Sequence, residues 1–331
     1  MSVTIKDIAK ESGVSYSTVS KALNDSPLVK PDTKKKVLKA AEMLGYTPNF
    51  AAKNLVSKKS RTIGLVWPAI DRAALTALVS KINELVTAQN YFMILSVDAA
   101  DKAVGMFKGF QVDGIVIFEE GKETKLPPQA AASVPILTYG VSGEHVHPII
   151  DVNHRKAIHL AVQHLTELGH SSISFIGSTN PGDKRQEEKL SGFYEAMNFS
   201  GLSVSEERIG STNGLGWYDG YLAAKKLLTD TKPTALISGS YDISVGILRA
   251  AKELNIRIPE DLSVISYDNI PQMASLETEL TSVGVPIDSL AEKMVSSLLS
   301  LIQQPDSISH TQLMEPELAA GKSAAPPKKH L

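Results

Sequence analysis

The sequence predicts an α/β protein: a small all-α helix-turn-helix head followed by two doubly wound subdomains, each built on a parallel sheet. Residues 1–48 contain short amphipathic helix patterns separated by a glycine turn and a loop rich in Asn, Asp and Pro. From residue 61 onward, apolar strands alternate with amphipathic helices, which is typical of parallel sheets covered on both faces. The length of 331 residues suits two or three domains.

The head is predicted to begin with two short helices. The first spans Val3 to Ser12 with Thr4 as its N-cap. Gly13 ends it, because glycine tolerates the left-handed conformation of a tight turn. Ser15 then caps the second helix, Tyr16 to Leu23.

A third helix is predicted from Pro31 to Leu44. Its buried stripe is expected to consist of Val37, Leu38, Ala41 and Leu44. Residues 49–60 are predicted to form a short helix and a polar linker, with Asn49 as the N-cap. Residues 316–331 are rich in Ala, Pro and Lys and are predicted to be a flexible tail.

Residues 61–315 are expected to form two interleaved subdomains, approximately 61–152 plus 286–313, and 153–285. Ligands of such sheets bind beyond the carboxyl ends of the strands. The predicted strands lie at Thr62–Trp67, Tyr91–Val97, Gly114–Phe118, Ile136–Tyr139, Ile173–Gly177, Thr234–Ser238 and Leu262–Tyr267. The helices predicted between and after them include His154–Leu168, Arg185–Met197 and Ile287–Ile302.

The composition excludes several classes of protein. The chain contains no cysteine, which removes disulfides, thiolate catalysis and cysteine-based zinc sites. The first residues are too charged for a secretory signal, and no apolar run is long enough to span a membrane. A cytoplasmic protein without a membrane partner is therefore expected.

Charge is distributed unevenly along the chain. The first 60 residues contain eleven lysines and five acidic residues, a net charge of +6 in a chain whose total is −2. A basic head on an acidic body is typical of a nucleic-acid reader joined to another module, although a solvated basic face is the alternative.

The head therefore carries candidate contacts to double-stranded DNA. The start of the second helix of a helix-turn-helix reaches base edges in the major groove. This places Tyr16, Ser17 and Lys21 for base readout. Short polar side chains fix the register on phosphates, and the candidates for this role are Thr4, Ser15, Thr18, Ser20 and Asn24.

Residues 4 to 59 resemble the lactose-repressor (LacI/GalR-type) family of bacterial transcription regulators. Two segments of the body, residues 164–173 and 258–268, are similar to the central and C-terminal signatures of that family. The matching residues of the head include Thr4-Ile5-x-Asp7-Ile8-Ala9, Gly13-Val14-Ser15, Thr18-Val19-Ser20, Leu23-Asn24 and Tyr46-x-Pro48-Asn49. The resemblance implies a body like a periplasmic binding protein, a homodimer, and repression through a pseudo-palindromic operator.

The resemblance also implies a role for residues 49–57. In the family this segment is a hinge helix that orders on operator DNA, and its leucine wedges into the minor groove. Leu55 and Ala52 occupy the corresponding positions, and Asn49 and Lys53 complete the predicted contacts. A leucine wedge unstacks a base step and bends the duplex, whereas the alternative is that Leu55 packs on the body.

The resemblance implies an effector site between the two subdomains. Asp268 matches a family position that binds ligand hydroxyls, although it could instead cap a backbone loop. Lys189 replaces the usual arginine of the family, and Ser240-Tyr241 replaces its Asn-Asp. Arg72, Arg185 and Lys189 could converge on the cleft, while Arg72 and Arg185 could equally be solvated surface cations.

These residues predict a ligand-responsive transcription regulator that is not an enzyme and needs no cofactor or metal. Three cations favour a sugar acid, such as a hexuronate, as the effector. The alternatives are a neutral sugar, a phosphosugar or a protein co-effector, and a sugar-binding transport receptor is disfavoured by the basic head. The chain has eight histidines, but none shows a metal-ligand spacing on one helix face, and no nucleophile has a base beside it.

Overall fold

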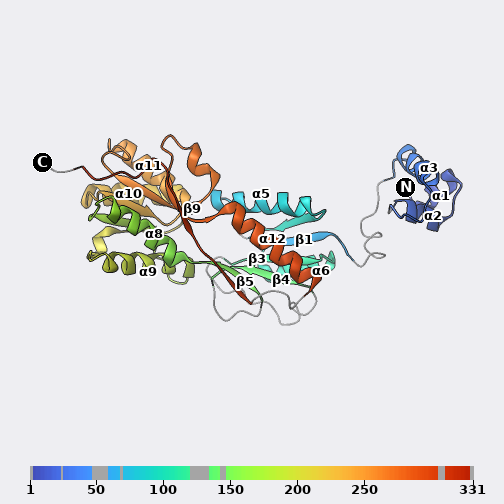
Figure 1. Cartoon of the computed structure of the whole chain (residues 1–331), viewed down its shortest axis with the longest axis horizontal. Helices are drawn as coiled ribbons and strands as arrows, with labels where there is room; N and C mark the ends of the chain where they lie inside the picture. Colours follow the sequence, from blue (N-terminus) through green and yellow to red (C-terminus); the bar gives the residue numbers. More distant parts are fainter. Residues whose placement is uncertain are drawn as a thin grey trace. The chain divides into compact units, whose positions relative to one another are not determined.

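The computed structural model describes residues 3–23, 25–46, 59–67, 70–119, 134–141, 147–304 and 310–328. It divides the chain into two compact units, Met1–Ser60 and Arg61–Leu331. We call the first unit the head and the second the body (Figure 1).

The head contains three helices, α1 (Ile5–Ser12), α2 (Tyr16–Leu23) and α3 (Pro31–Met43). Gly13 has φ of 65° and its N–H donates to the carbonyl of Ala9, so the glycine turn forms as predicted. The core of the head consists of Ile8, Val19, Ala22, Val37, Ala40 and Ala41.

One prediction about the core of the head is wrong. Leu38, expected in the buried stripe of α3, is 46% exposed. Ala40 is buried in its place, with Val37 and Ala41. The small alanines allow α3 to approach α1 and α2 closely, and this approach sets which face of α3 is covered.

The body contains two six-stranded sheets. Sheet A has the order β11-β5-β4-β3-β1-β2 and is parallel throughout. Its strands are β1 (Thr62–Val66), β2 (Phe92–Ser96), β3 (Gly114–Phe118), β4 (Ile136–Tyr139), β5 (Ile149–Val152) and β11 (Thr311–Met314).

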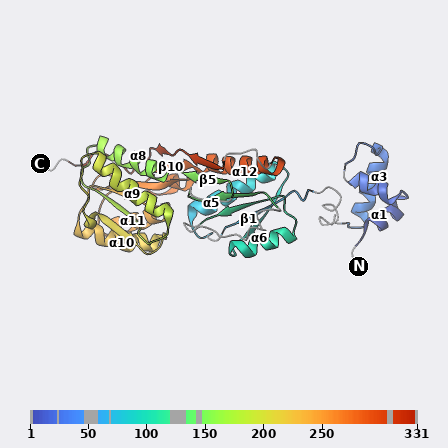
Figure 2. The same cartoon turned by 90° about the horizontal axis from the view of Figure 1, so that it is seen from below.

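Helices cover both faces of sheet A. Helices α5 (Ala73–Ala88) and α12 (Ile287–Gln303) pack together with the hydrophobic cluster on one face. Helix α6 (Ala100–Gly109) packs with a second cluster on the other face (Figure 2). We call sheet A with these three helices the N-subdomain.

Sheet B has the order β12-β10-β9-β8-β6-β7 and is parallel except for β12. Its strands are β6 (Ile173–Ser178), β7 (Ile209–Thr212), β8 (Ala235–Ser238), β9 (Ser263–Asn269), β10 (Thr281–Pro286) and β12 (Glu317–Ala319). Sheet B and its covering segments form the C-subdomain.

Two helix pairs cover the two faces of sheet B (Figure 1). One pair consists of α8 (His154–Glu167) and α9 (Lys184–Phe199), and the other of α10 (Trp217–Asp230) and α11 (Tyr241–Glu253). Two short 3-10 helices, Glu206–Arg208 and Pro271–Ser275, lie in the connections.

The chain passes three times between the two subdomains. The passages follow β5, β10 and β11, so α12 covers sheet A although it follows a strand of sheet B. Two passages are joined directly, because the N–H of Asn153 donates to the carbonyl of Met314 and the Lys156 ammonium pairs with Glu315. These short connections bring the carboxyl ends of both sheets to the same cleft.

The prediction that residues 316–331 form a flexible tail is wrong for residues 317–328. Strand β12 pairs antiparallel with β10. Beyond it, Ser323 is fully buried, where it accepts from the N–H of Thr281 and donates to the carbonyl of Val264. Short side chains let this segment lie flat against the sheet, and its backbone groups find partners there.

Candidate functional site

The first site predicted from sequence is the exposed start of α2. Ser15 caps this helix, because its Oγ accepts a hydrogen bond from the N–H of Thr18 at 3.2 Å. The Ser15 hydroxyl also shares hydrogen bonds with the hydroxyls of Ser17 and Thr18. The Tyr16 side chain is 56% exposed, and Lys21 is exposed one turn further along. The start of α2, the part of a helix-turn-helix that reaches base edges, is therefore exposed and capped within the head itself.

The remaining candidate DNA contacts differ in how they are placed. Ser20 is half-buried. The N–H and hydroxyl of Thr4 both donate to the carboxylate of Asp7, at 2.8 and 2.7 Å, so Thr4 serves as the predicted cap of α1. Asn24 and the hinge residues Asn49, Ala52, Lys53 and Leu55 lie outside the described residues.

The second site is a cavity of about 250 Å³ between the two subdomains. The structure brings all three predicted effector residues, Arg72, Lys189 and Asp268, to its wall, together with Arg185. Arg72 precedes α5 in the N-subdomain, whereas Lys189 and Arg185 lie on α9 and Asp268 lies in β9 of the C-subdomain. A ligand here would touch both subdomains at once.

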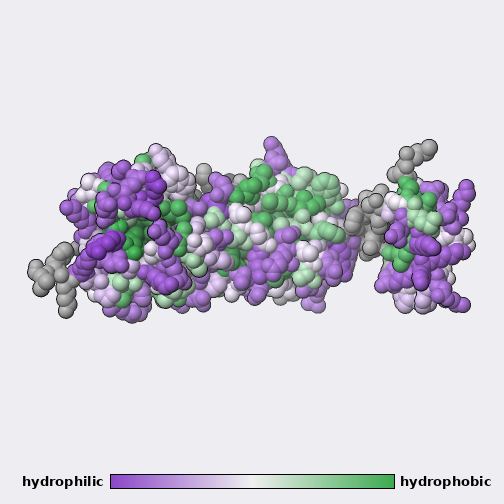
Figure 3. Space-filling model, turned by 90° about the horizontal axis from the view of Figure 1, so that it is seen from above, coloured by the Kyte–Doolittle hydropathy of each residue, from purple (hydrophilic) through white to green (hydrophobic). Residues whose placement is uncertain are grey.

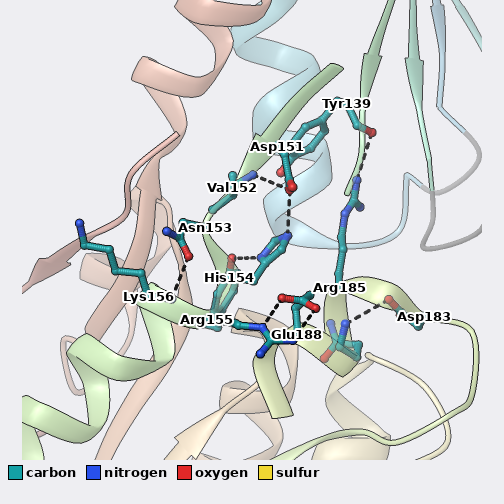
Figure 4. A network of polar contacts seen from close by, with 12 residues as sticks. Tyr139, Asp151, Val152, Asn153, His154, Arg155, Lys156, Asp183, Arg185 and Glu188 are labelled. Atoms are coloured by element: carbon teal, nitrogen blue, oxygen red, sulfur yellow. Dashed lines mark hydrogen bonds and ion pairs between the residues drawn. The ribbon is translucent and has the colours of Figure 1, made fainter. Parts of the chain in front are cut away.

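Arg185 already links the subdomains. Its Nη2 donates to the carbonyl of Tyr139 at 3.1 Å, as Figure 4 shows. Its guanidinium carbon lies 4.3 and 4.8 Å from the ring centroids of Phe118 and Tyr139, within the range of a cation–π contact. Arg185 is thus held over an aromatic wall of the N-subdomain.

Several buried polar atoms at the cavity have no hydrogen-bond partner within the described part of the chain. They are the Nε atoms of Arg72 and Arg185 and the Oε1 atom of Gln186. Leaving a buried donor or acceptor unpaired costs on the order of 1–3 kcal/mol, and more where the group is charged. Such atoms are poised to gain binding energy from a ligand that pairs them.

Lys189 is the most buried of the three cations, at 3% exposure. Its Nζ donates to the carbonyl of Gly239 at 2.8 Å and lies 3.5 Å from the centroid of the Tyr267 ring. Burial lowers the pKa of Lys189 to about 7, an effect that Asp268 opposes and that Arg72 reinforces. Near pH 7, the ammonium and neutral amine forms of Lys189 are therefore populated to similar extents.

Asp268 combines both roles that the sequence left open. It lines the cavity, and its Oδ2 accepts the N–H of Tyr241 at 2.9 Å, which caps the start of α11. Its φ of 83° is the left-handed region, which Asp tolerates better than most residues. Asp242, next to this cap, has its pKa raised by burial and by Asp268 and lowered by Arg72.

His154, Tyr139, Tyr267, Asp183 and Gln186 also line the cavity, and none of these five was singled out in the sequence. His154 lies where β5 passes into α8, and its Nδ1 is hydrogen-bonded to the Tyr267 hydroxyl. Its Nε2 lies 3.7 Å from Asp151 (Figure 4). Burial lowers the pKa of His154 well below its usual value. Tyr139 and Tyr267 lie near the carboxyl ends of their strands. The rule that ligands of parallel sheets bind at those ends could have identified them from the sequence.

Helix termini add to the positive character of the cavity. Helices α5, α8, α9 and α12 all begin within or beside its wall. The N-terminus of a helix carries a partial positive charge and exposed N–H groups, which favour an anion nearby. Asp183 caps α9 by accepting the N–H of Gln186 and offsets part of this charge.

A basic helix-turn-helix joined to a two-subdomain body with a polar cleft defines a DNA-binding regulator that responds to a ligand. Residues 4–49 match the family model of bacterial regulatory proteins of the lacI family, and residues 162–324 match a periplasmic binding protein-like domain.

Full-length relatives agree with these matches. Catabolite control protein A of Priestia megaterium is 33% identical, over 94% of this chain and 99% of that protein. The probable HTH-type transcriptional repressor ExuR of Bacillus subtilis (strain 168) is 29% identical over 92% and 93%. The crystal structure of the lac repressor dimer bound to operator and the anti-inducer ONPF matches with a TM-score of 0.84 and 26% identity, over 98% and 100%.

The chain belongs to the lacI family of bacterial regulatory proteins. It is a cytoplasmic, DNA-binding transcription regulator and not an enzyme, which confirms the predicted family and fold class. No helix in the described ranges is long and apolar enough to cross a membrane.

Proposed function

We propose that the protein is a dimeric repressor whose effector is a small sugar-derived carboxylate bound in the cavity between the subdomains. The observation that carries this proposal is the convergence of Arg72, Arg185 and Lys189 on one cavity. With a neutral sugar bound, the three cations of the cavity wall would share the two lining carboxylates of Asp183 and Asp268 and gain no further anion. A carboxylate would pair the unpartnered Nε atoms of the two arginines.

The cavity also offers surfaces for the rest of a sugar. Asp268 is suited to accept from ligand hydroxyls, because a carboxylate can accept several hydrogen bonds. Tyr139 and Tyr267 add aromatic surface to the cavity wall, with Arg185 and Lys189 lying against their rings. This combination favours a sugar acid over a plain dicarboxylate, which has fewer hydroxyls to bind.

A homodimer is supported by the exposed apolar surface of the body. Hydrophobic side chains gather over the N-subdomain on the face that Figure 3 shows. The edge strand β2 exposes Phe92 and Leu95, and Val97 follows it. In the C-subdomain, α10 exposes Trp217, Tyr218 and Leu222. Patches of this kind mark protein interfaces, and a two-fold dimer presents two heads to a pseudo-palindromic operator.

The proposed regulation is a shift between two arrangements of the subdomains. A ligand that pairs Arg72 of the N-subdomain with Lys189 of the C-subdomain favours one arrangement over the other. We infer that this preference is transmitted to the head through the N-subdomain, whose first strand, β1, follows the head in the chain. Coupling of this kind changes DNA affinity by about 5- to 150-fold, or about 1–3 kcal/mol.

The test compares matched ligands that differ in the carboxylate alone. Purified protein is melted with D-galacturonate or D-glucuronate and, as controls, with D-galactose or D-glucose. We expect the acids to raise the melting temperature at millimolar concentration and the neutral sugars to leave it unchanged. The active acid is then added to a fluorescence-anisotropy titration with operator duplex selected from a randomised pool.

Stabilisation by the neutral sugars alone would contradict an acidic effector. Stabilisation by no sugar at all would direct the search to phosphosugars or a protein co-effector. The dimer is tested separately by sedimentation of the full chain and of the variant Phe92→Asp, which we expect to shift the protein toward the monomer.

A further inference from the structure

Lys189 combines three features that are rare in one lysine. Its side chain is 3% exposed and forms part of the cavity wall. Its one recorded hydrogen bond runs from Nζ to the carbonyl of Gly239. Among the described residues, no carboxylate lies within ion-pairing distance of Nζ, and the face of the Tyr267 ring lies 3.5 Å away. The charge is buried without a direct counter-ion.

Burial favours the neutral amine of Lys189, whereas the Gly239 carbonyl and the face of the Tyr267 ring favour its ammonium form. Burial is the largest cause that lowers the pKa of Lys189, to about 7, and Arg72 and Arg185 lower it further, against Asp268 and Asp183. A lysine that is desolvated and set beside other cations becomes a nucleophile near neutral pH. Compared with an exposed lysine, it holds about 1,000-fold more neutral amine at pH 7.

We propose that Lys189 captures the effector covalently, through an imine between its Nζ and a free aldehyde or ketone of a small carboxylate. The inference rests on the proposed function, because the same cavity and the same arginines would hold the carboxylate. Arg72 and Arg185 are planar donors that suit a carboxylate, whereas Nζ is a single atom on a flexible stem that can reach a carbonyl carbon.

The chemistry needs no cofactor and no redox partner. The lone pair of Nζ attacks the carbonyl carbon, and the π electrons move to the oxygen to form a carbinolamine. The nitrogen lone pair then forms the C=N bond as the oxygen departs. Both amine protons end on that oxygen, which leaves as water, so the products are an imine and one water molecule.

The neighbours of Lys189 are compatible with this step. The carbonyl of Gly239 accepts one N–H, and an amine held in this way keeps its lone pair free of any recorded donor. The ring of Tyr267 restrains the side chain on one side, and the hydroxyl of that tyrosine is held by His154. Lys189 also lines the cavity, so its side chain is within reach of a ligand bound there.

The experiment uses the full chain at pH 7 with sodium cyanoborohydride, which reduces an imine to a stable secondary amine. D-Galacturonate supplies an aldehyde by ring opening, and pyruvate supplies a ketone. Intact mass and peptide mapping report the adduct. We expect one adduct per chain at Lys189, formed at least tenfold faster than at an exposed lysine such as Lys156.

Matched controls separate the two chemical requirements. D-Galactose has the aldehyde without the carboxylate, and methyl α-D-galactopyranosiduronate has the carboxylate with its carbonyl locked. Neither should label Lys189. Lys189→Arg keeps the positive charge and cannot form an imine, so it should lose the adduct while still melting cooperatively.

Labelling of Lys189 by galacturonate or by pyruvate supports the proposal and assigns the carbonyl as an aldehyde or a ketone. Absence of an adduct at Lys189, while methyl α-D-galactopyranosiduronate still stabilises the protein, overturns the covalent step and leaves the proposed function standing. If no carboxylate stabilises the protein and none labels Lys189, both proposals fail.

Discussion

The affinity of the cavity for a carboxylate should fall as the pH rises from 7 to 9. The free protein holds Lys189 with a pKa of about 7, and the charged groups facing it are Arg72, Arg185, Asp183 and Asp268. A bound carboxylate favours the ammonium form and raises this pKa again. Above pH 7, binding of the carboxylate is therefore coupled to protonation of Lys189, and the affinity falls as the pH rises.

The size of the effect follows from the fraction of Lys189 that is protonated. That fraction falls from about one half at pH 7 to about one hundredth at pH 9, so the affinity should fall about 50-fold, or about 2.3 kcal/mol. The other cavity groups whose pKa is shifted, His154, Tyr139 and Tyr267, stay neutral over this range. Burial lowers the pKa of His154 and raises the pKa values of Tyr139 and Tyr267.

Isothermal titration calorimetry with methyl α-D-galactopyranosiduronate measures this dependence. The locked glycoside is chosen because it cannot form an imine, so the covalent step does not enter. Lys189→Arg is the control, since a guanidinium stays charged throughout, and its affinity should change less than threefold. A flat profile in the unmodified protein, or an equally steep one in the arginine variant, would refute the reasoning.

Four further outcomes are expected. Lys189→Met should raise the free energy of unfolding of the ligand-free protein by a few kcal/mol below pH 7. The pKa of Lys189 is about 7 in the folded state against 10.5 for a free lysine, so burial of the ammonium destabilises the fold below pH 7 and does so less as the pH rises. Thermal melts at pH 6 and pH 9 measure this difference. Asp268→Ala should lower the free energy of unfolding by about 1–2 kcal/mol, because it removes the acceptor for the first N–H of α11 and places alanine at a positive φ. Asp268→Asn should keep most of that stability, and urea unfolding of both variants measures the difference. Ser323→Ala should cost about 1–3 kcal/mol by leaving the Thr281 N–H and the Val264 carbonyl unpaired, and a flexible tail would instead show no change in the same assay. Lys21→Ala should weaken operator binding by about 1–3 kcal/mol in anisotropy titrations, and equal affinity would remove Lys21 from the DNA interface.

Local sequence signals were sufficient for the three helices of the head and for seven strands of the body, whereas β5, β7, β10, β11 and β12 were not predicted. The glycine turn at Gly13 and the cap at Ser15 act over three or four residues, so their effect can be predicted without knowledge of the fold. The strand predicted at Gly114–Phe118 matches β3 at both ends. Apolar runs in a parallel sheet are buried on both faces, which makes the pattern unambiguous.

Sequence reasoning also selected Arg72, Lys189 and Asp268, all of which line one cavity. It selected them through a family resemblance and through a surplus of cations near predicted loop ends. It could not show that Lys189 is buried without an ion pair, because that depends on Tyr267 and Gly239, which lie far from it in the chain.

By itself, the sequence determined the class of the protein, the alternation of strands and helices in its body and the surplus of cations near its cleft, because these follow from short-range periodicity, turn residues and formal charge. Only the tertiary structure decided which side chains are buried together and which backbone segments pair. His154 meets Tyr267 across 113 positions of the chain, and Ser323 meets Val264 across 59. Such contacts depend on the packing of whole sheets, and the same packing lowers the pKa of Lys189 and orders residues 317–328.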